Sequence, residues 1–319
     1  MVWFYILIFI ASCALLYFAG GWVIEGLMRM ARFLGWREFV VAFFVMAFAS
    51  SLPNFFIGIS SALRKIPQLS FGDIAGNNLI ALTLAVALAV FFARGGLSAE
   101  SRMVQATSVF TMASAILPLM LIYDGLLSRT DAVLLICFFA FYIFWLFSKR
   151  ERFTKIYDGY KVSVIKQLPV FLKDLGKVAL GITLLIISAQ GIVVSAKFFA
   201  QAFNTPLILI GILITGFGTA LPEVYFAVTS ARRGETWMVL GDLMGSVIIP
   251  ATLILGIVAL IHPIEVVNFS LFAVARFFLI LSAVFFFFFV RSGRKITKKE
   301  GFILLAIYIT FVIVEILIK

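Results

Sequence analysis

The chain contains few of the side chains that enzymes use for catalysis or that proteins use to bind transition metals. Its 319 residues include one histidine, His262, and two cysteines, Cys13 and Cys137, which lie inside apolar runs. This count excludes a disulfide framework and a thiolate metal site. The sequence also shows no nucleophile triad, no paired His and Glu and no phosphate-binding loop. We therefore predict that the protein is not an enzyme and that it has no cofactor.

Charged residues are also scarce, at 13% of the chain, whereas hydrophobic residues make up 63%. Soluble domains are roughly half apolar and about a quarter charged, so we predict an all-α membrane protein whose partner is the lipid bilayer. A transmembrane helix needs about 20 mainly apolar residues, and clusters of charged or turn-forming residues separate ten such segments. The predicted spans are 2–28, 38–63, 70–92, 103–123, 127–148, 170–196, 206–231, 236–261, 267–290 and 299–318.

Basic residues are distributed unevenly between the two sides that ten spans create. Twenty lie in links that follow odd-numbered spans, and five lie on the opposite side. Because basic links remain in the cytoplasm, we expect an integral, multi-pass plasma-membrane protein with both termini outside. This bias accounts for the net charge of +11 without a nucleic-acid partner. Near an end of span one, Glu25 and Arg29 are four residues apart and are expected to pair.

The longest link divides the chain into two halves. We predict a first five-helix repeat at 1–148, a basic cytoplasmic linker at 149–169 and a second five-helix repeat at 170–319. An odd number of spans per repeat makes the second repeat enter the membrane from the opposite side. The fold is therefore expected to consist of ten transmembrane helices in two inverted five-helix repeats.

Two polar motifs occur once in each half, always 169 residues apart. S-S-L-P-N at 50–54 corresponds to T-A-L-P-E at 219–223, and G-D-I-A-G at 72–76 corresponds to G-D-L-M-G at 241–245. Between 48–84 and 217–253, twelve of 37 positions are identical without a gap. A duplicated, Gly- and Pro-interrupted pair of apolar segments indicates the binding site of a secondary transporter.

The first motif supplies oxygen atoms around a proline. Each proline removes a helical hydrogen bond and disfavours helical geometry at the residue before it, so we expect released carbonyls and hydroxyls there. Glu223 follows the second proline and is the strongest single candidate, because a carboxylate in mid-span costs about 2.5–3.5 kcal/mol unless a cation or proton offsets it. Kinks at Pro, Ser and Thr also occur in membrane helices for purely structural reasons.

The second motif places an acid on the same helix face as a neutral polar residue. Asp73 and Asn77 are four residues apart, as are Asp242 and Ser246. Either aspartate could instead occupy a first-turn, partly wet position that the helix dipole stabilises. The predicted cation-binding residues of both motifs are Glu223, Asn54, Ser50, Ser51, Thr219, Asn77, Ser246, Asp73 and Asp242.

Together these motifs resemble the alpha-repeats of the sodium/calcium exchangers, in the calcium/cation antiporter superfamily. Those repeats carry G-T-S-L-P-E on one helix and G-N-x-x-G-S on the next. The resemblance implies alternating access around a central cation cluster, with spans two, three, seven and eight building it. It also implies that spans one and six slide across this core.

The sequence departs from the family pattern at several ligand positions. Asn54 replaces one of the two acids that follow Leu-Pro, and Ala81 and Pro250 stand where the family carries a further Asn or Asp ligand. Conversely, Asp73 and Asp242 replace an asparagine. Either the three acids Glu223, Asp73 and Asp242 together form a relocated metal-binding cluster, or Glu223 alone serves a monovalent ion or proton and the aspartates line an entrance.

These observations predict a secondary active cation antiporter. Sodium/calcium exchange by alternating access at a midplane site is the main hypothesis, with sodium, calcium or protons as the transported ions. Two alternatives remain open. One is a proton-coupled monovalent cation exchanger, and the other is a non-transporting membrane regulator that keeps the exchanger fold.

Overall fold

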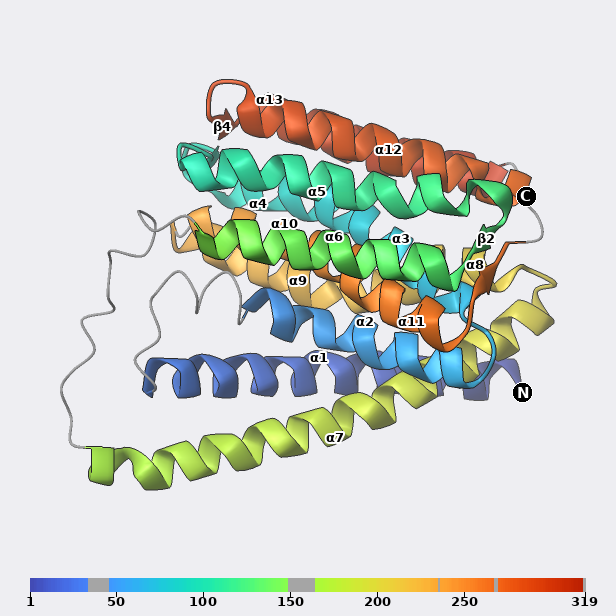
Figure 1. Ribbon diagram of the computed structural model, residues 1–319, viewed down its shortest axis with the longest axis horizontal. Helices are drawn as coiled ribbons and strands as arrows, with labels where there is room; N and C mark the ends of the chain where they lie inside the picture. The colour runs from blue at the N-terminus through green and yellow to red at the C-terminus, as the bar shows by residue number, and fades with distance from the viewer. Residues whose placement is uncertain (34–45, 149–163, 235, 267–268, 318–319) are drawn as a thin grey trace.

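The computed structural model describes residues 1–33, 46–148, 164–234, 236–266 and 269–317. Within these ranges, nine helices are long and apolar enough to cross a membrane, and a shorter apolar helix lies at Ala47–Leu63. The helices run side by side along the long axis of the molecule (Figure 1). The predicted start of span two, in 34–45, and most of the predicted linker, in 149–163, lie outside the described residues.

The first half contains five membrane crossings. They are formed by α1 (Val2–Phe33), α2 (Met46–Leu63), the continuous α3 (Gln68–Ile80), η2 (Ala81–Ala85) and α4 (Val86–Phe92), then α5 (Arg102–Leu121) with the short η3 (Ile122–Asp124), and α6 (Arg129–Ser148). Two strands, β1 (Leu97–Ser98) and β2 (Leu126–Leu127), lie in the connections.

The second half repeats this order. Its crossings are formed by α7 (Val164–Ala202), the continuous α8 (Leu207–Ile210), η5 (Gly211–Thr215) and α9 (Gly216–Arg232), then α10 (Thr236–Ile249), η6 (Pro250–Ile254) and α11 (Leu255–Ile261), then α12 (Phe269–Arg291) and α13 (Lys298–Leu317). The strands β3 (Ile264–Glu265) and β4 (Lys295–Ile296) again lie in connections. The predicted fold of ten transmembrane helices in two inverted repeats is confirmed.

The short strands display the inverted symmetry directly. β1 pairs antiparallel with β4, and β2 pairs antiparallel with β3, so each two-stranded sheet takes one strand from each half. β2 and β4 occupy positions that correspond at the 169-residue offset, yet they lie at opposite ends of the bundle (Figure 1). The helix α1 begins, and α13 ends, at the end that carries β2 (Figure 1).

Each half also widens into a π-helix at the same place. The segments η2 and η6 begin at Ala81 and Pro250, which are 169 residues apart. A π-turn changes the helical hydrogen-bond register and is frequent at functional sites. The segment η5 is a third π-helix. In each of the three, a threonine hydroxyl donates to the carbonyl four residues earlier: Thr83 to Leu79, Thr215 to Gly211 and Thr252 to Ile248. These side-chain bonds help to satisfy the backbone where its ladder is irregular.

Glycines allow α3 to cross the α8–η5–α9 segment with backbones in contact. A Cβ on Gly72 would lie 2.1 Å from the carbonyl oxygen of Ile208, and one on Gly76 would lie 2.3 Å from that of Ile212. On the opposing helix, a Cβ on Gly211 would lie 2.7 Å from the Leu69 carbonyl oxygen. Small residues permit this approach between membrane helices, and the crossing holds the two halves together at mid-membrane.

Replacing Gly76 should disrupt this crossing. The added methyl of Gly76→Ala meets backbone atoms, which cannot rotate away. We therefore expect the free energy of unfolding to fall by about 1–3 kcal/mol. The effect is measured by thermal unfolding in detergent, with tryptophan fluorescence as the readout. The matched control is Gly21→Ala on α1, where nothing lies within 4 Å of the new Cβ. An unchanged midpoint for Gly76→Ala would contradict the close crossing.

The helices α1 and α7 form a pair along one side of the bundle (Figure 1). They share an apolar cluster, separate from the main core, that includes Leu16, Val23, Leu185 and Ile192. The same cluster includes Ile57 of α2, Leu69 of α3 and Ile210 of α8, so it also joins the pair to the rest of the bundle. The sliding of α1 and α7 that the family resemblance implies stays a prediction.

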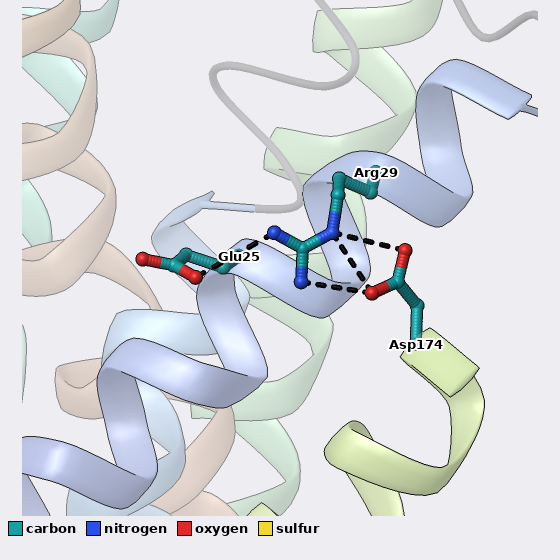
Figure 2. Close-up of polar contacts among 3 residues, drawn as sticks. All are labelled: Glu25, Arg29 and Asp174. Atoms are coloured by element: carbon teal, nitrogen blue, oxygen red, sulfur yellow. Dashed lines mark hydrogen bonds and ion pairs between the residues drawn. The ribbon is translucent and has the colours of Figure 1, made fainter. Parts of the chain in front are cut away.

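An ion pair joins α1 to α7 near one end of this cluster. The Arg29 guanidinium lies 2.8 Å from a carboxylate oxygen of Asp174, and its Nε donates to both oxygens of that carboxylate at 2.9 Å. The predicted pairing with Glu25 is confirmed, but it is longer, at 3.5 Å. Figure 2 shows Arg29 between Glu25 on its own helix and Asp174 on α7. The Asp174 side chain is only 7% exposed, against 65% for Glu25.

Asp174 should therefore contribute more stability than Glu25. We expect Asp174→Asn to cost about 1–2 kcal/mol because it weakens a half-buried, charge-assisted contact between helices. Glu25→Gln removes only an exposed pair and should cost less than about 0.5 kcal/mol. Detergent unfolding of both variants provides the comparison. Equal effects of the two substitutions would show that the α1–α7 ion pair contributes no more to stability than the exposed pair does.

Candidate functional site

The predicted polar motifs come together at the centre of the bundle on α2, α3, α9 and α10. Pro53 lies inside α2 and Pro222 inside α9, and both helices run through without a break. We expected the residue before each proline to leave the helix, and this was wrong. Nearby hydroxyls bond carbonyls of their own helices: Ser50 and Ser51 donate to Ala47, and Thr219 donates to Thr215 and Gly216. Such bonds keep a proline-containing membrane helix intact.

Asp73 accepts hydrogen bonds from both repeats. The Asn54 amide nitrogen lies 3.1 Å from one carboxylate oxygen, and the Thr219 hydroxyl lies 3.1 Å from the other. The same Asn54 nitrogen also reaches the Thr219 hydroxyl, at 3.5 Å. Thr215, one turn before Thr219, is a further hydroxyl near Asp73, although it donates to the Gly211 carbonyl of its own helix. We did not predict Thr215, although its spacing of four residues from Thr219 places both hydroxyls on one helix face.

Asp242 occupies the equivalent place in the second repeat. The Ser50 hydroxyl, which corresponds to that of Thr219, lies 3.3 Å from its carboxylate. At the position equivalent to Asn54, however, Asp242 faces the acid Glu223 instead of an amide donor. The two repeats therefore place their polar side chains at equivalent positions, but the charge differs, because a neutral amide in one repeat is replaced by an acid in the other.

Glu223 lies between the two halves of this cluster. The Asn77 amide nitrogen is 3.3 Å and 3.4 Å from its two carboxylate oxygens, and the Ser246 hydroxyl is a second neutral partner. Its acidic neighbours are Asp242 and, less strongly, Asp73. Ser246 also donates to the Leu243 carbonyl on its own helix.

All the predicted ligand residues are buried. Glu223 is 1% exposed, Asp73 0% and Asp242 2%, so none of the three carboxylates faces lipid or an open surface. Asp73 and Asp242 lie more than one turn inside α3 and α10, not at their first turns. This position does not match the partly wet helix start that we considered for the aspartates.

Two oxygens in the cluster have no hydrogen-bond partner among the residues that the structure describes. They are the side-chain carbonyl oxygens of Asn54 and Asn77, and both residues are fully buried. Each amide group uses its nitrogen to hold a carboxylate, which directs its oxygen elsewhere. Buried polar atoms without a partner are uncommon, and neutral amide oxygens are ligands for hard cations.

The acids are not gathered into one compact metal centre. Across the described ranges, no group of three or more His, Cys, Asp and Glu side chains is arranged to hold a metal ion. Instead, each carboxylate has its own neutral neighbours: Asn54 and Thr219 for Asp73, Asn77 and Ser246 for Glu223, and Ser50 for Asp242. Neutral amides and hydroxyls therefore accompany each of the three acids.

Comparison with known proteins places this site in a family. The family described as sodium/calcium exchanger protein matches residues 4–148 and 174–317. The chain is 24% identical to the sodium/calcium exchanger MaX1 of Methanosarcina acetivorans, over 91% of this chain and 92% of that protein. It is 25% identical to the inner membrane protein YrbG of Escherichia coli, over 74% of each chain.

A solved structure has the same fold. The sodium-calcium exchanger NCX_Mj, soaked with 2.5 mM Na⁺ and 10 mM Sr²⁺, superposes with a TM-score of 0.68 and 25% identity, covering 98% of this chain and 99% of that one. The family match spans both halves of the chain and includes both copies of each polar motif. The protein therefore belongs to the sodium/calcium exchanger family.

Proposed function

We propose that the protein exchanges cations across the plasma membrane by alternating access, with Glu223 as the principal ligand of the moving ion. The observation that carries this proposal is the environment of Glu223. Its carboxylate is buried at the crossing of the two repeats, its hydrogen-bond donors among the described residues are neutral, and its acidic neighbours are Asp242 and Asp73. Such a group needs a cation or a proton to be stable in the membrane.

This requirement also explains how exchange could occur without leak. An empty site would leave several buried carboxylates uncompensated while the protein changes its accessibility, which is costly in a low-dielectric interior. A site filled by one ion, or by its competitor, removes that cost. The change between inward and outward access is therefore favoured only when an ion is bound, and this coupling defines an exchanger.

We favour sodium and calcium as the exchanged ions, with sodium moving down its gradient. The cluster offers carboxylate, amide and hydroxyl oxygens, which are the ligands of hard cations. Calcium takes six to eight oxygens, and Ala81 and Pro250 contribute no side-chain oxygen where the family carries one. In our proposal Asp73 and Asp242, which lie about two helix turns before Ala81 and Pro250, replace the lost ligands.

Proton-coupled exchange of a monovalent cation is the second candidate. It is favoured by the separation of the acids, because no three of the described carboxylates form a compact metal centre. In that arrangement Glu223, Asn77 and Ser246 would serve a singly charged ion, and the aspartates would act on it from a distance.

Orientation follows from the same proposal. The end of the bundle that carries β4 faces the cytoplasm, because the links there are rich in basic residues, and both termini face outside.

Substitution of Glu223 tests the proposal. In proteoliposomes with an imposed sodium gradient, we expect calcium or monovalent cation uptake by the wild type and none by Glu223→Gln. The reason is that the amide keeps the shape of the side chain but removes the charge that holds the ion. The control is Glu265→Gln, which changes the exposed residue of β3 and should transport normally. Wild-type uptake by Glu223→Gln, with Glu265→Gln equally active, would refute the central role of Glu223.

Charge removal at the aspartates separates a direct role from an entrance role. A cation that binds only the folded protein stabilises it by RT ln(1 + c/Kd), where c is the free concentration of the ion, so affinity can be measured by following the unfolding midpoint while sodium, calcium or potassium is titrated. We expect Asp73→Asn and Asp242→Asn each to lower the affinity for the preferred ion about tenfold, which corresponds to about 1.4 kcal/mol of binding free energy. Unchanged affinity with a slower flux would show instead that the aspartates only line the entrance.

A further inference from the structure

A second polar site lies away from the cation cluster, at the end of the bundle that carries β4. It is a cavity of about 540 Å³ between the connection that follows α4, the turn that joins α9 to α10, and the strand β4. Four basic side chains line it, from three separate parts of the chain: Arg94, Arg232, Arg233 and Lys295. Among the described residues that line it, Glu100 is the one acid.

The walls of this cavity are fixed by backbone contacts. β1 pairs with β4, and the Ala99 amide donates to the Arg294 carbonyl at 2.8 Å. Gly96 has a φ of +88°, and a Cβ there would lie 2.4 Å from the Ile296 carbonyl oxygen. Only glycine therefore permits this approach of the connection to β4, which positions Arg94 and Lys295 on one wall.

The opposite wall is also ordered. The Arg232 guanidinium stacks over the Phe92 ring at 4.2 Å from its centroid, which joins the last residue of α9 to the last residue of α4. Gly234, with a φ of +81°, forms the turn that directly follows Arg233. The end of α9 therefore contributes Arg232 and Arg233 to the same cavity that Arg94 and Lys295 line.

We propose that this cavity binds an anion that carries phosphate groups. The described lining residues place four cations against one acid in a solvent-open cavity, which attracts a multiply charged anion. Arginine also pairs well with phosphate oxygens in bidentate geometry. Such phosphates occur in the headgroups of anionic lipids and in soluble diphosphates. Both sources share the chemistry that the four side chains recognise.

An anion bound here would connect segments that lead to the cation cluster. α9 extends from this cavity to Glu223, nine residues before Arg232, which is about 14 Å along a helix. α10 extends from the same turn to Asp242. Binding would thus attach the ends of two ligand-carrying helices to the β1–β4 sheet.

Binding can be measured without any transport assay. Purified protein in neutral detergent is titrated with inorganic pyrophosphate, and separately placed in nanodiscs with and without phosphatidylglycerol, while the unfolding midpoint is followed. We expect at least one probe to stabilise the wild type. The double variant Arg94→Gln/Arg233→Gln should weaken that response about tenfold or more, and Lys295→Gln should weaken it less.

The matched control removes the same charge from the same end of the molecule. Lys298→Gln/Lys299→Gln changes two exposed lysines at the start of α13 that do not line the cavity, and it should respond like the wild type. A response to pyrophosphate alone identifies a soluble ligand, and one to phosphatidylglycerol alone identifies a lipid. Neither probe stabilising the wild type, or equal losses in cavity and control variants, would overturn the proposal, since general surface charge would then account for the basic residues. Lys295→Gln gives an independent result if the double variant does not fold.

Discussion

The structure depends on three carboxylates placed where water is excluded. Glu223, Asp73 and Asp242 are buried at the meeting point of the two repeats, and neutral amides and hydroxyls surround them. A carboxylate that has lost its water must be compensated by hydrogen bonds, by a proton or by a cation. The hydrogen bonds here come from four helices, so the position of each acid depends on how those helices cross. The geometry of the site is consequently set by the packing of the helices that form the fold.

The glycine crossing shows how closely the two are linked. Gly72 and Gly76 lie on either side of Asp73, and Gly76 directly precedes Asn77. Because these glycines bring the backbone of α3 against α8, η5 and α9, the side chains of Asp73 and Asn77 reach across to Thr219 and Glu223. A larger residue at either glycine would separate the donors from the acceptors. The same short segment therefore supplies both the packing surface and the polar groups.

Much of this could be predicted from the sequence, because lipid restricts what a chain can do. The apolar runs define the spans, the odd number of spans per repeat defines the inversion, and duplicated polar residues in those runs indicate the site. Other details could not be predicted, because they depend on side chains that are distant in sequence. The hydrogen bond from Thr219 to Asp73 and the ion pair between Arg29 and Asp174 both arise from tertiary packing. A list of motifs contains no information on which donor reaches which acceptor.

The exchange of strands between the halves has a consequence for how the chain assembles. β1 and β2 belong to the first repeat, yet each finds its partner in the second. The first repeat on its own would leave two strand edges unpaired, one at each end of the bundle. Neither sheet can close until the second repeat is in place, so the two ends of the bundle are joined only once both halves have been inserted.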